Sequence, residues 1–122
     1  MKKAAPRVEG LAVVEKYDSV FRYLYNITRT MPRRHGVFRD ELLQCMLRIP
    51  RLLYVAAKSN QISRVREADA ELAALRWHLR MAEAWPLQVI TSGQHGTVSV
   101  LLAEVGSMLG DWIARLSGGR HG

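Results

Sequence analysis

The residues best suited to chemistry in this sequence are arginines that gather at one short turn. The stretch MPRRHGVFRD, residues 31–40, places Arg33, Arg34, His35 and Arg39 around a proline and a glycine. The guanidinium group of arginine is planar and binds two phosphate oxygens at once. A turn also lifts its side chains away from the flanking helices, so this stretch predicts a surface for a phosphate backbone or an acidic protein partner.

Further basic residues extend this pattern along the chain. Arg22 and Arg29 are seven residues apart, on the face of a predicted helix opposite its core, and this face leads towards the turn. A second basic group falls in a stretch, residues 42–66, that contains no acidic residue. Its members are Arg48, Arg51, Lys58, Arg64 and Arg66. A solvated surface explains any single arginine, but basic residues kept apart from acidic ones favour a polyanion that is bound through its phosphates.

The overall composition agrees with an anionic partner. The sequence holds 18 Lys and Arg against 11 Asp and Glu, a formal charge of +7, and 14 of the basic residues are arginine. A single cysteine, Cys45, allows no internal disulfide and fits a reducing cytoplasm. There is no secretory signal pattern, and no apolar run approaches the roughly 18 residues that cross a bilayer. We therefore expect a cytoplasmic protein that has no membrane partner.

Motifs for catalysis and cofactor binding are missing from the sequence. None of the four histidines follows a glutamate by three residues, which is the pattern of di-iron helical bundles. One cysteine is too few for a zinc site of the common types, and the sequence contains neither a P-loop nor a nucleophile elbow. We therefore expect no enzyme activity, no catalytic residue, no bound metal and no cofactor.

Four amphipathic helices would position these residues. Apolar residues recur at alternating steps of three and four in four segments, which is the spacing of one helix face. The segments are Val13, Tyr17, Val20, Leu24, Ile27 and Met31; Phe38, Leu42, Cys45, Ile49, Leu52 and Ala56; Val65, Ala68, Leu72, Leu75, Leu79 and Ala82; and Val98, Leu101, Val105, Met108 and Trp112. Short connections and the absence of any strand pattern predict an all-α, up-down-up-down four-helix bundle. It forms one domain, residues 1–122, with an ordered core at about 12–117 and short flexible ends.

Proline and polar residues predict the boundaries of the first three helices. Pro32 ends the first helix, and Pro50 should kink the second without ending it. Asn60 is expected to adopt a left-handed conformation after the second helix, and Ser63 to cap the third. Trp85-Pro86 closes the third helix.

Two opposing signals bracket the start of the fourth helix. Thr91 and Gln94 have the spacing of a capping box, whereas two glycines, Gly93 and Gly96, each cost about 1 kcal/mol inside a helix. The start is therefore expected between residues 91 and 97. The helix should close near Leu116, before a glycine-rich tail.

Two of the predicted helices carry a second apolar face, opposite the one that would enter the core. A single exposed aromatic residue is ordinary, but the same feature on two adjacent helices indicates a subunit interface. Its residues are Leu47, Tyr54, Ala70, Ala74, Trp77 and Met81. We expect a homo-oligomer anchored by Trp77, because a large ring buries much area at a small loss of conformational entropy.

Several segments of the sequence resemble a known family. The most specific are YLY at 23–25, PRRHG at 32–36, KSNQ at 58–61, LRWHLR at 75–80 and AEVGSMLGDWIARL at 103–116. They resemble Avd, the accessory variability determinant of diversity-generating retroelements, and the resemblance runs from about residue 12 to residue 117.

The resemblance implies a four-helix bundle that assembles into a homopentameric barrel with a basic surface. It also implies a non-enzymatic accessory protein that binds the element's reverse transcriptase and its template RNA or cDNA during mutagenic retrohoming. The basic residues named above would contact these partners. Two alternatives remain open: a ribosomal-RNA-associated four-helix bundle protein, which would bind RNA without a polymerase, and a structural oligomer whose charge only keeps it in solution.

Overall fold

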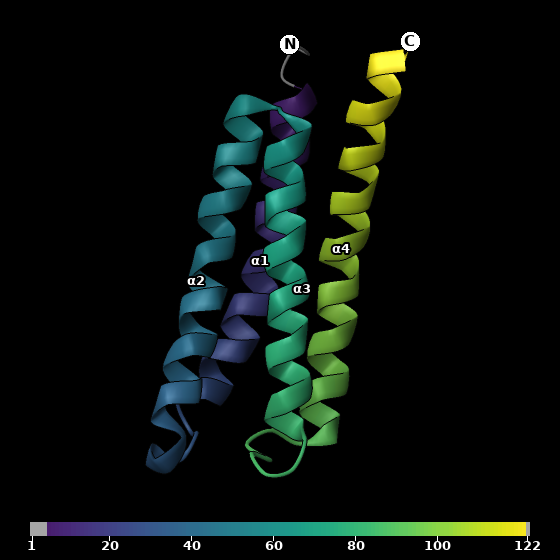
Figure 1. The fold of residues 1–122 in the computed structure, drawn as a ribbon. Helices are drawn as coiled ribbons and strands as arrows, with labels where there is room; N and C mark the ends of the chain where they lie inside the picture. Colours follow the sequence, from purple (N-terminus) through teal and green to yellow (C-terminus); the bar gives the residue numbers. More distant parts are fainter. Residues whose placement is uncertain (1–4, 122) are drawn as a thin grey trace.

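The computed structural model describes residues 5–121, with side chains described for residues 10–118, and consists of four long helices joined by short connections (Figure 1). The elements are α1 (Ala5–Thr28), a short 3-10 helix η2 (Arg33–His35), α2 (Gly36–Ser59), α3 (Ile62–Glu83) and α4 (Ser92–His121). Successive helices run in opposite directions, and each packs against two others. Residues 5–121 contain no strand. The predicted all-α four-helix bundle is confirmed, and its assembly into a barrel stays a prediction.

One apolar core runs along the bundle. All six residues predicted for the core face of α1, and all six predicted for α3, are buried. Burial of one Leu or Val side chain stabilises a fold by about 1.5–3 kcal/mol, so these faces hold the helices together. The largest buried side chains are Trp112 of α4 and Tyr17 of α1.

The core register differs from the prediction in α2 and α4. Leu53 is fully buried in place of Leu52, and Leu102 and Leu109 are buried where the sequence predicted two other residues of α4. The displaced residues Leu52, Leu101 and Met108, together with Phe38, are only partly buried at the edge of the core. Apolar residues are adjacent at 52 and 53, 101 and 102, and 108 and 109, so steps of three and four fit either register. Contact with the neighbouring helices decides between them.

The connection between α2 and α3 confirms one predicted cap and corrects the other. Asn60 has φ of 54° and ψ of 33°, the predicted left-handed conformation, and its N–H donates to Ala56 O at 2.7 Å. Ser63 does not cap α3. The helix begins at Ile62, with Gln61 at its N-cap and no side-chain cap bond, because the turn at Asn60 reverses the chain within two residues and places Ser63 inside the first helical turn.

The α4 start is as predicted, but its end is not. The N–H of Thr91 donates to Oε1 of Gln94 at 2.9 Å, and the N–H of Gln94 donates to Oγ1 of Thr91 at 3.0 Å, which completes the capping box. The expected end near Leu116 is wrong, since α4 continues to His121. Glycine lowers helix propensity by about 1 kcal/mol but does not forbid a helix.

Three other predicted boundaries shift by a few residues. α1 ends at Thr28, before Pro32, and α3 ends at Glu83, before Trp85-Pro86. The hydroxyl groups of Thr28 and Thr30 donate to nearby carbonyl oxygens, which offers the backbone an alternative to further helix. α1 begins at Ala5, ahead of the predicted ordered core, and the part of the flexible-end prediction that falls on residues 1–4 and 122 lies outside the described residues.

α2 passes through Pro50 as one helix, as predicted. The expected kink stays a prediction.

Among the described residues, α4 has one stretch, Ser92–Gly118, that is long and apolar enough to cross a membrane by length and composition alone. The core helix of a bundle passes the same test, and Val98, Leu102 and Val105 place one face of α4 in the core.

Candidate nucleic-acid interface

The predicted basic turn lies at the end of the bundle where α1 leads into α2 (Figure 1). Arg33 and Arg34 form most of η2, and both are exposed. Neither has an ion pair with an acid among residues 10–118, whose side chains the structure describes. His35 and Arg39 are only partly exposed, and the guanidinium of Arg39 contacts Asp40 at 3.2 Å. The unneutralised charge of the turn therefore comes from Arg33 and Arg34.

Two exposed arginines of the α1 segment continue this surface. Arg29 follows the last residue of α1 and donates to Oδ1 of Asn26 at 3.4 Å. Arg22 is seven residues earlier, about 10 Å along the helix axis, and is exposed too. We call Arg22, Arg29, Arg33, Arg34, His35 and Arg39 the turn group. The structure brings most of it to one end of the bundle, with Arg22 about two helical turns away.

The second basic group is partly neutralised by a neighbouring helix. Nε of Arg48 donates to Oε2 of Glu71 at 3.1 Å, and this bond raises the pKa of the Arg48 guanidinium above its ordinary value. Arg64 contacts Glu67 at 3.3 Å on α3. The stretch 42–66 is free of acids in sequence, but α3 supplies them in space. In the part of the chain that the structure describes, the remaining members Arg51, Lys58 and Arg66 are exposed without an ion pair.

The antiparallel fold separates the two basic groups. The turn group lies where α1 joins α2, whereas Lys58, Arg64 and Arg66 flank the α2–α3 turn at the opposite end (Figure 1). α2 has 24 residues, about 36 Å of helix. A polyanion that contacts both groups on one protomer must therefore follow the long axis of the bundle.

The predicted subunit interface is an apolar strip on α2 and α3, which pack against each other. Leu47, Tyr54 and Trp77 remain 58%, 47% and 48% exposed. Ala70 is exposed, whereas Ala74 and Met81 are partly buried. The strip therefore exists as a surface of the protomer, and its role as an interface stays a prediction. Sequence periodicity missed Val100 of α4, which is 62% exposed.

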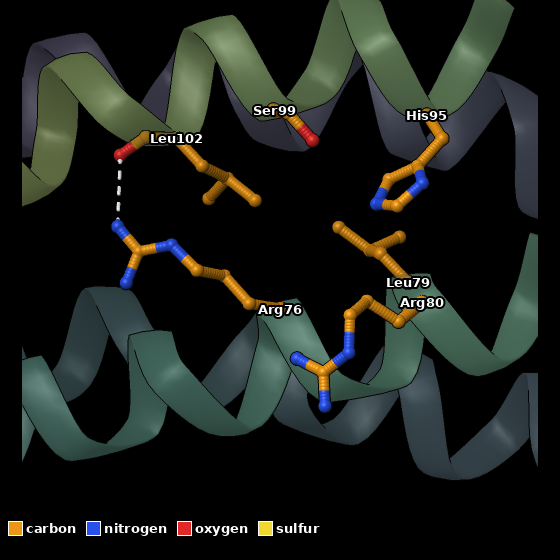
Figure 2. A pocket seen from close by; sticks show the side chains of 6 residues that line it. All are labelled: Arg76, Leu79, Arg80, His95, Ser99 and Leu102. Atoms are coloured by element: carbon orange, nitrogen blue, oxygen red, sulfur yellow. Dashed lines mark hydrogen bonds between the residues drawn. The ribbon is translucent and has the colours of Figure 1, made fainter. Parts of the chain in front are cut away.

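A basic pocket that the sequence patterns did not indicate lies between α3 and α4. Figure 2 shows its lining, which is Arg76, Leu79, Arg80, His95, Ser99 and Leu102. Its volume is about 210 Å³. Arg76 and Arg80 are four residues apart and so share one face of α3, a spacing that is visible in the segment LRWHLR. The facing residues come from a helix that begins twelve residues later, and only the fold brings the two sets together.

The thiol of Cys45 has no environment that would make it reactive. Cys45 is fully buried, and its Sγ donates to Glu71 O at 3.7 Å. Burial, followed by the influence of Glu71, raises the pKa of Cys45 to about 12. The thiol therefore keeps its proton at neutral pH and is a poor nucleophile. Within the described residues no three His, Cys, Asp or Glu side chains gather as metal ligands.

Comparison with models of protein families shows to which family the chain belongs. A family model described as bAvd-like matches residues 11–116. The chain belongs to the bAvd-like family. A comparison with curated proteins found no match.

The bAvd-like match confirms the resemblance to Avd that the sequence motifs predicted. The bAvd-like family is an accessory, non-catalytic family associated with diversity-generating retroelements. The match includes parts of all four helices, both basic groups, the apolar strip and the α3–α4 pocket. These surfaces therefore belong to the bAvd-like domain itself.

Proposed function

We propose that this protein is the accessory subunit of a diversity-generating retroelement, and that it holds the reverse transcriptase and the template RNA or cDNA together during mutagenic retrohoming in the cytoplasm. Membership of the bAvd-like family supports the accessory role. The observation that carries the nucleic-acid part is the pair Arg33 and Arg34, which are exposed and without an ion pair among the described residues.

The charge distribution favours binding through phosphates. Exposed guanidinium groups contact phosphate oxygens, and such contacts position a protein on nucleic acid without reading its sequence. The reverse transcriptase would then select the template and carry out polymerisation. Acidic surfaces of the polymerase are a second target for the same arginines.

Oligomerisation would strengthen this binding. We propose a homo-oligomer, a pentamer by resemblance to Avd, that buries the apolar strip centred on Trp77 and repeats each basic group around a symmetry axis. The summed positive potential of a ring exceeds that of one protomer and favours a long polyanion over a small anion.

The experiment that tests this function is coexpression with the reverse transcriptase encoded beside the gene, followed by affinity purification at two salt concentrations. We expect the polymerase and RNA to copurify at low salt, and RNA to be lost as salt rises. A protein that binds RNA but never the polymerase would instead support a ribosomal-RNA-associated role. A protein that binds neither would leave only the structural oligomer.

A further inference from the structure

The pocket between α3 and α4 presents hydrogen-bond donors from both of its walls. Arg76 and Arg80 come from α3, and Figure 2 shows the imidazole of His95 and the hydroxyl of Ser99 on the facing side of α4. Guanidinium groups only donate, while hydroxyl and imidazole groups do either. The set therefore suits a ligand that is rich in acceptor oxygens and negatively charged.

The positive charge of this pocket is not neutralised by an ion pair. Within the described residues, neither Arg76 nor Arg80 has an acidic partner. Glu83, one turn further along α3, has its Oε1 against Nδ1 of His95. This contact occupies the carboxylate, and it fixes the imidazole ring so that its other edge faces the pocket (Figure 2).

Arg76 is held in place before any ligand arrives. Its Nη2 donates to Leu102 O at 3.4 Å (Figure 2), and the residue is partly buried. A Cβ atom on Gly106 would lie 2.5 Å from the same nitrogen. The absence of a side chain at Gly106 therefore leaves the space that the guanidinium occupies. The Arg76 guanidinium has five N–H groups, and the Leu102 oxygen accepts a hydrogen bond from one of them. The others can donate to a ligand.

The pocket also adjoins the basic end of the bundle. Residues 76–80 are in the last turns of α3, and residues 95–102 are near the start of α4. The α3–α4 connection lies at the same end as the α1–α2 turn that carries Arg33 and Arg34 (Figure 1). A nucleic-acid strand that crosses this end of the bundle can therefore contact both the turn group and the pocket.

We propose that the α3–α4 pocket binds one phosphate group, with Arg76 and Arg80 as its cationic ligands and Ser99 as a further donor. The source of this phosphate is the backbone of bound RNA, and this choice of source rests on the proposed function. Inorganic phosphate offers the same chemistry, so the experiment compares the two.

The most specific variant displaces the Arg76 guanidinium without removing its charge. In Gly106→Ala the added methyl group displaces the guanidinium, whereas in Gly110→Ala, one turn later on α4, a Cβ atom meets nothing within 4 Å. Both changes raise helix propensity equally. Arg76→Gln with Arg80→Gln is the direct test, and circular dichroism checks that every variant is folded.

RNA affinity is measured by fluorescence anisotropy with a labelled single-stranded oligonucleotide, and phosphate binding by NMR shifts of the Arg76 Nε–H and the His95 ring. We expect Gly106→Ala to lower RNA affinity about tenfold, as loss of one charge-assisted hydrogen bond would, while Gly110→Ala leaves affinity unchanged. RNA should also displace inorganic phosphate from the pocket of the parent protein.

Two results would overturn the proposal, and only the second of them also overturns the proposed function. If the parent binds RNA and both Gly106→Ala and the double arginine variant bind it equally well, the pocket is not part of the RNA site, although the wider function stands. If inorganic phosphate shifts the Arg76 and His95 signals but the parent binds no RNA, the assigned source is wrong and the proposed function fails with it.

Discussion

The hydroxyl group of Tyr17 donates a hydrogen bond of 2.7 Å to the backbone oxygen of Met46 inside the core. Met46 precedes Pro50 by four residues, and proline has no N–H with which to bond this oxygen in the usual helical way. Tyr17 therefore supplies from α1 the donor that α2 lacks. Burial raises the pKa of Tyr17 far above its ordinary value, so the hydroxyl keeps its proton.

Replacing this hydroxyl should destabilise the bundle. Tyr17→Phe leaves the buried Met46 oxygen without its donor, and the expected loss in the free energy of unfolding is about 1–3 kcal/mol. Pro50→Ala restores a backbone N–H to α2, so the same Tyr17→Phe change should cost less in that background. Urea denaturation of the four proteins measures the coupling. An equal cost in both backgrounds would show that Tyr17 does not substitute for the missing N–H.

Because the thiol of Cys45 is buried, the free energy of unfolding should fall in alkaline solution. The pKa of Cys45 is about 12 in the folded protein, against 9.0 for the free group. The folded state therefore binds this proton more tightly, and stability is unaffected below about pH 9 but falls between pH 9 and 12 by about 1.4 kcal/mol per pH unit. Cys45→Ala removes this contribution, so its thermal midpoint should fall less steeply with pH. Parallel pH profiles for the two proteins would contradict the assignment.

The turn group should dominate RNA binding over the arginines that already have acidic partners. Arg33→Gln with Arg34→Gln removes two unpaired charges, and we expect the slope of log K against log salt to fall by about 1.4 for single-stranded RNA. The matched control is Arg48→Gln with Arg64→Gln, which removes the same charge from residues that contact Glu71 and Glu67. Anisotropy titrations at several salt concentrations measure both slopes. Equal reductions would mean that net charge alone controls binding.

Trp77 provides the test of the apolar strip. It is 48% exposed on α3, and Trp77→Glu places a charge where the proposed interface must exclude water, which should dissociate the oligomer. Val100→Glu on α4 changes an exposed apolar residue outside the strip and should leave the oligomer intact. Light scattering coupled to gel filtration gives the mass of each. If Trp77→Glu keeps the parent's mass, the interface lies elsewhere, and dissociation by Val100→Glu would place it on α4.

The helix boundaries show which structural features the local sequence determines. The capping box of Thr91 and Gln94 and the left-handed Asn60 were predictable, because each depends on residues within one turn of the chain. The predicted cap at Ser63 is wrong because a serine just inside a helix has the same composition signal as one at its cap. The predicted end of α4 is wrong because glycine changes only the free energy of a helix and does not set a stop.

The sequence by itself determined the number and type of the four long helices, the core faces of α1 and α3 and the basic character of the α1–α2 turn, since helical periodicity and turn chemistry act between residues close along the chain. Only the tertiary structure decided which of Leu101 and Leu102 enters the core, that Glu71 neutralises Arg48, and that Arg76 of α3 and His95 of α4 line one pocket. Each of these depends on which side chains of an adjacent helix lie at the same level along the bundle axis. Packing of the whole bundle sets that level, and local sequence patterns carry no information about it.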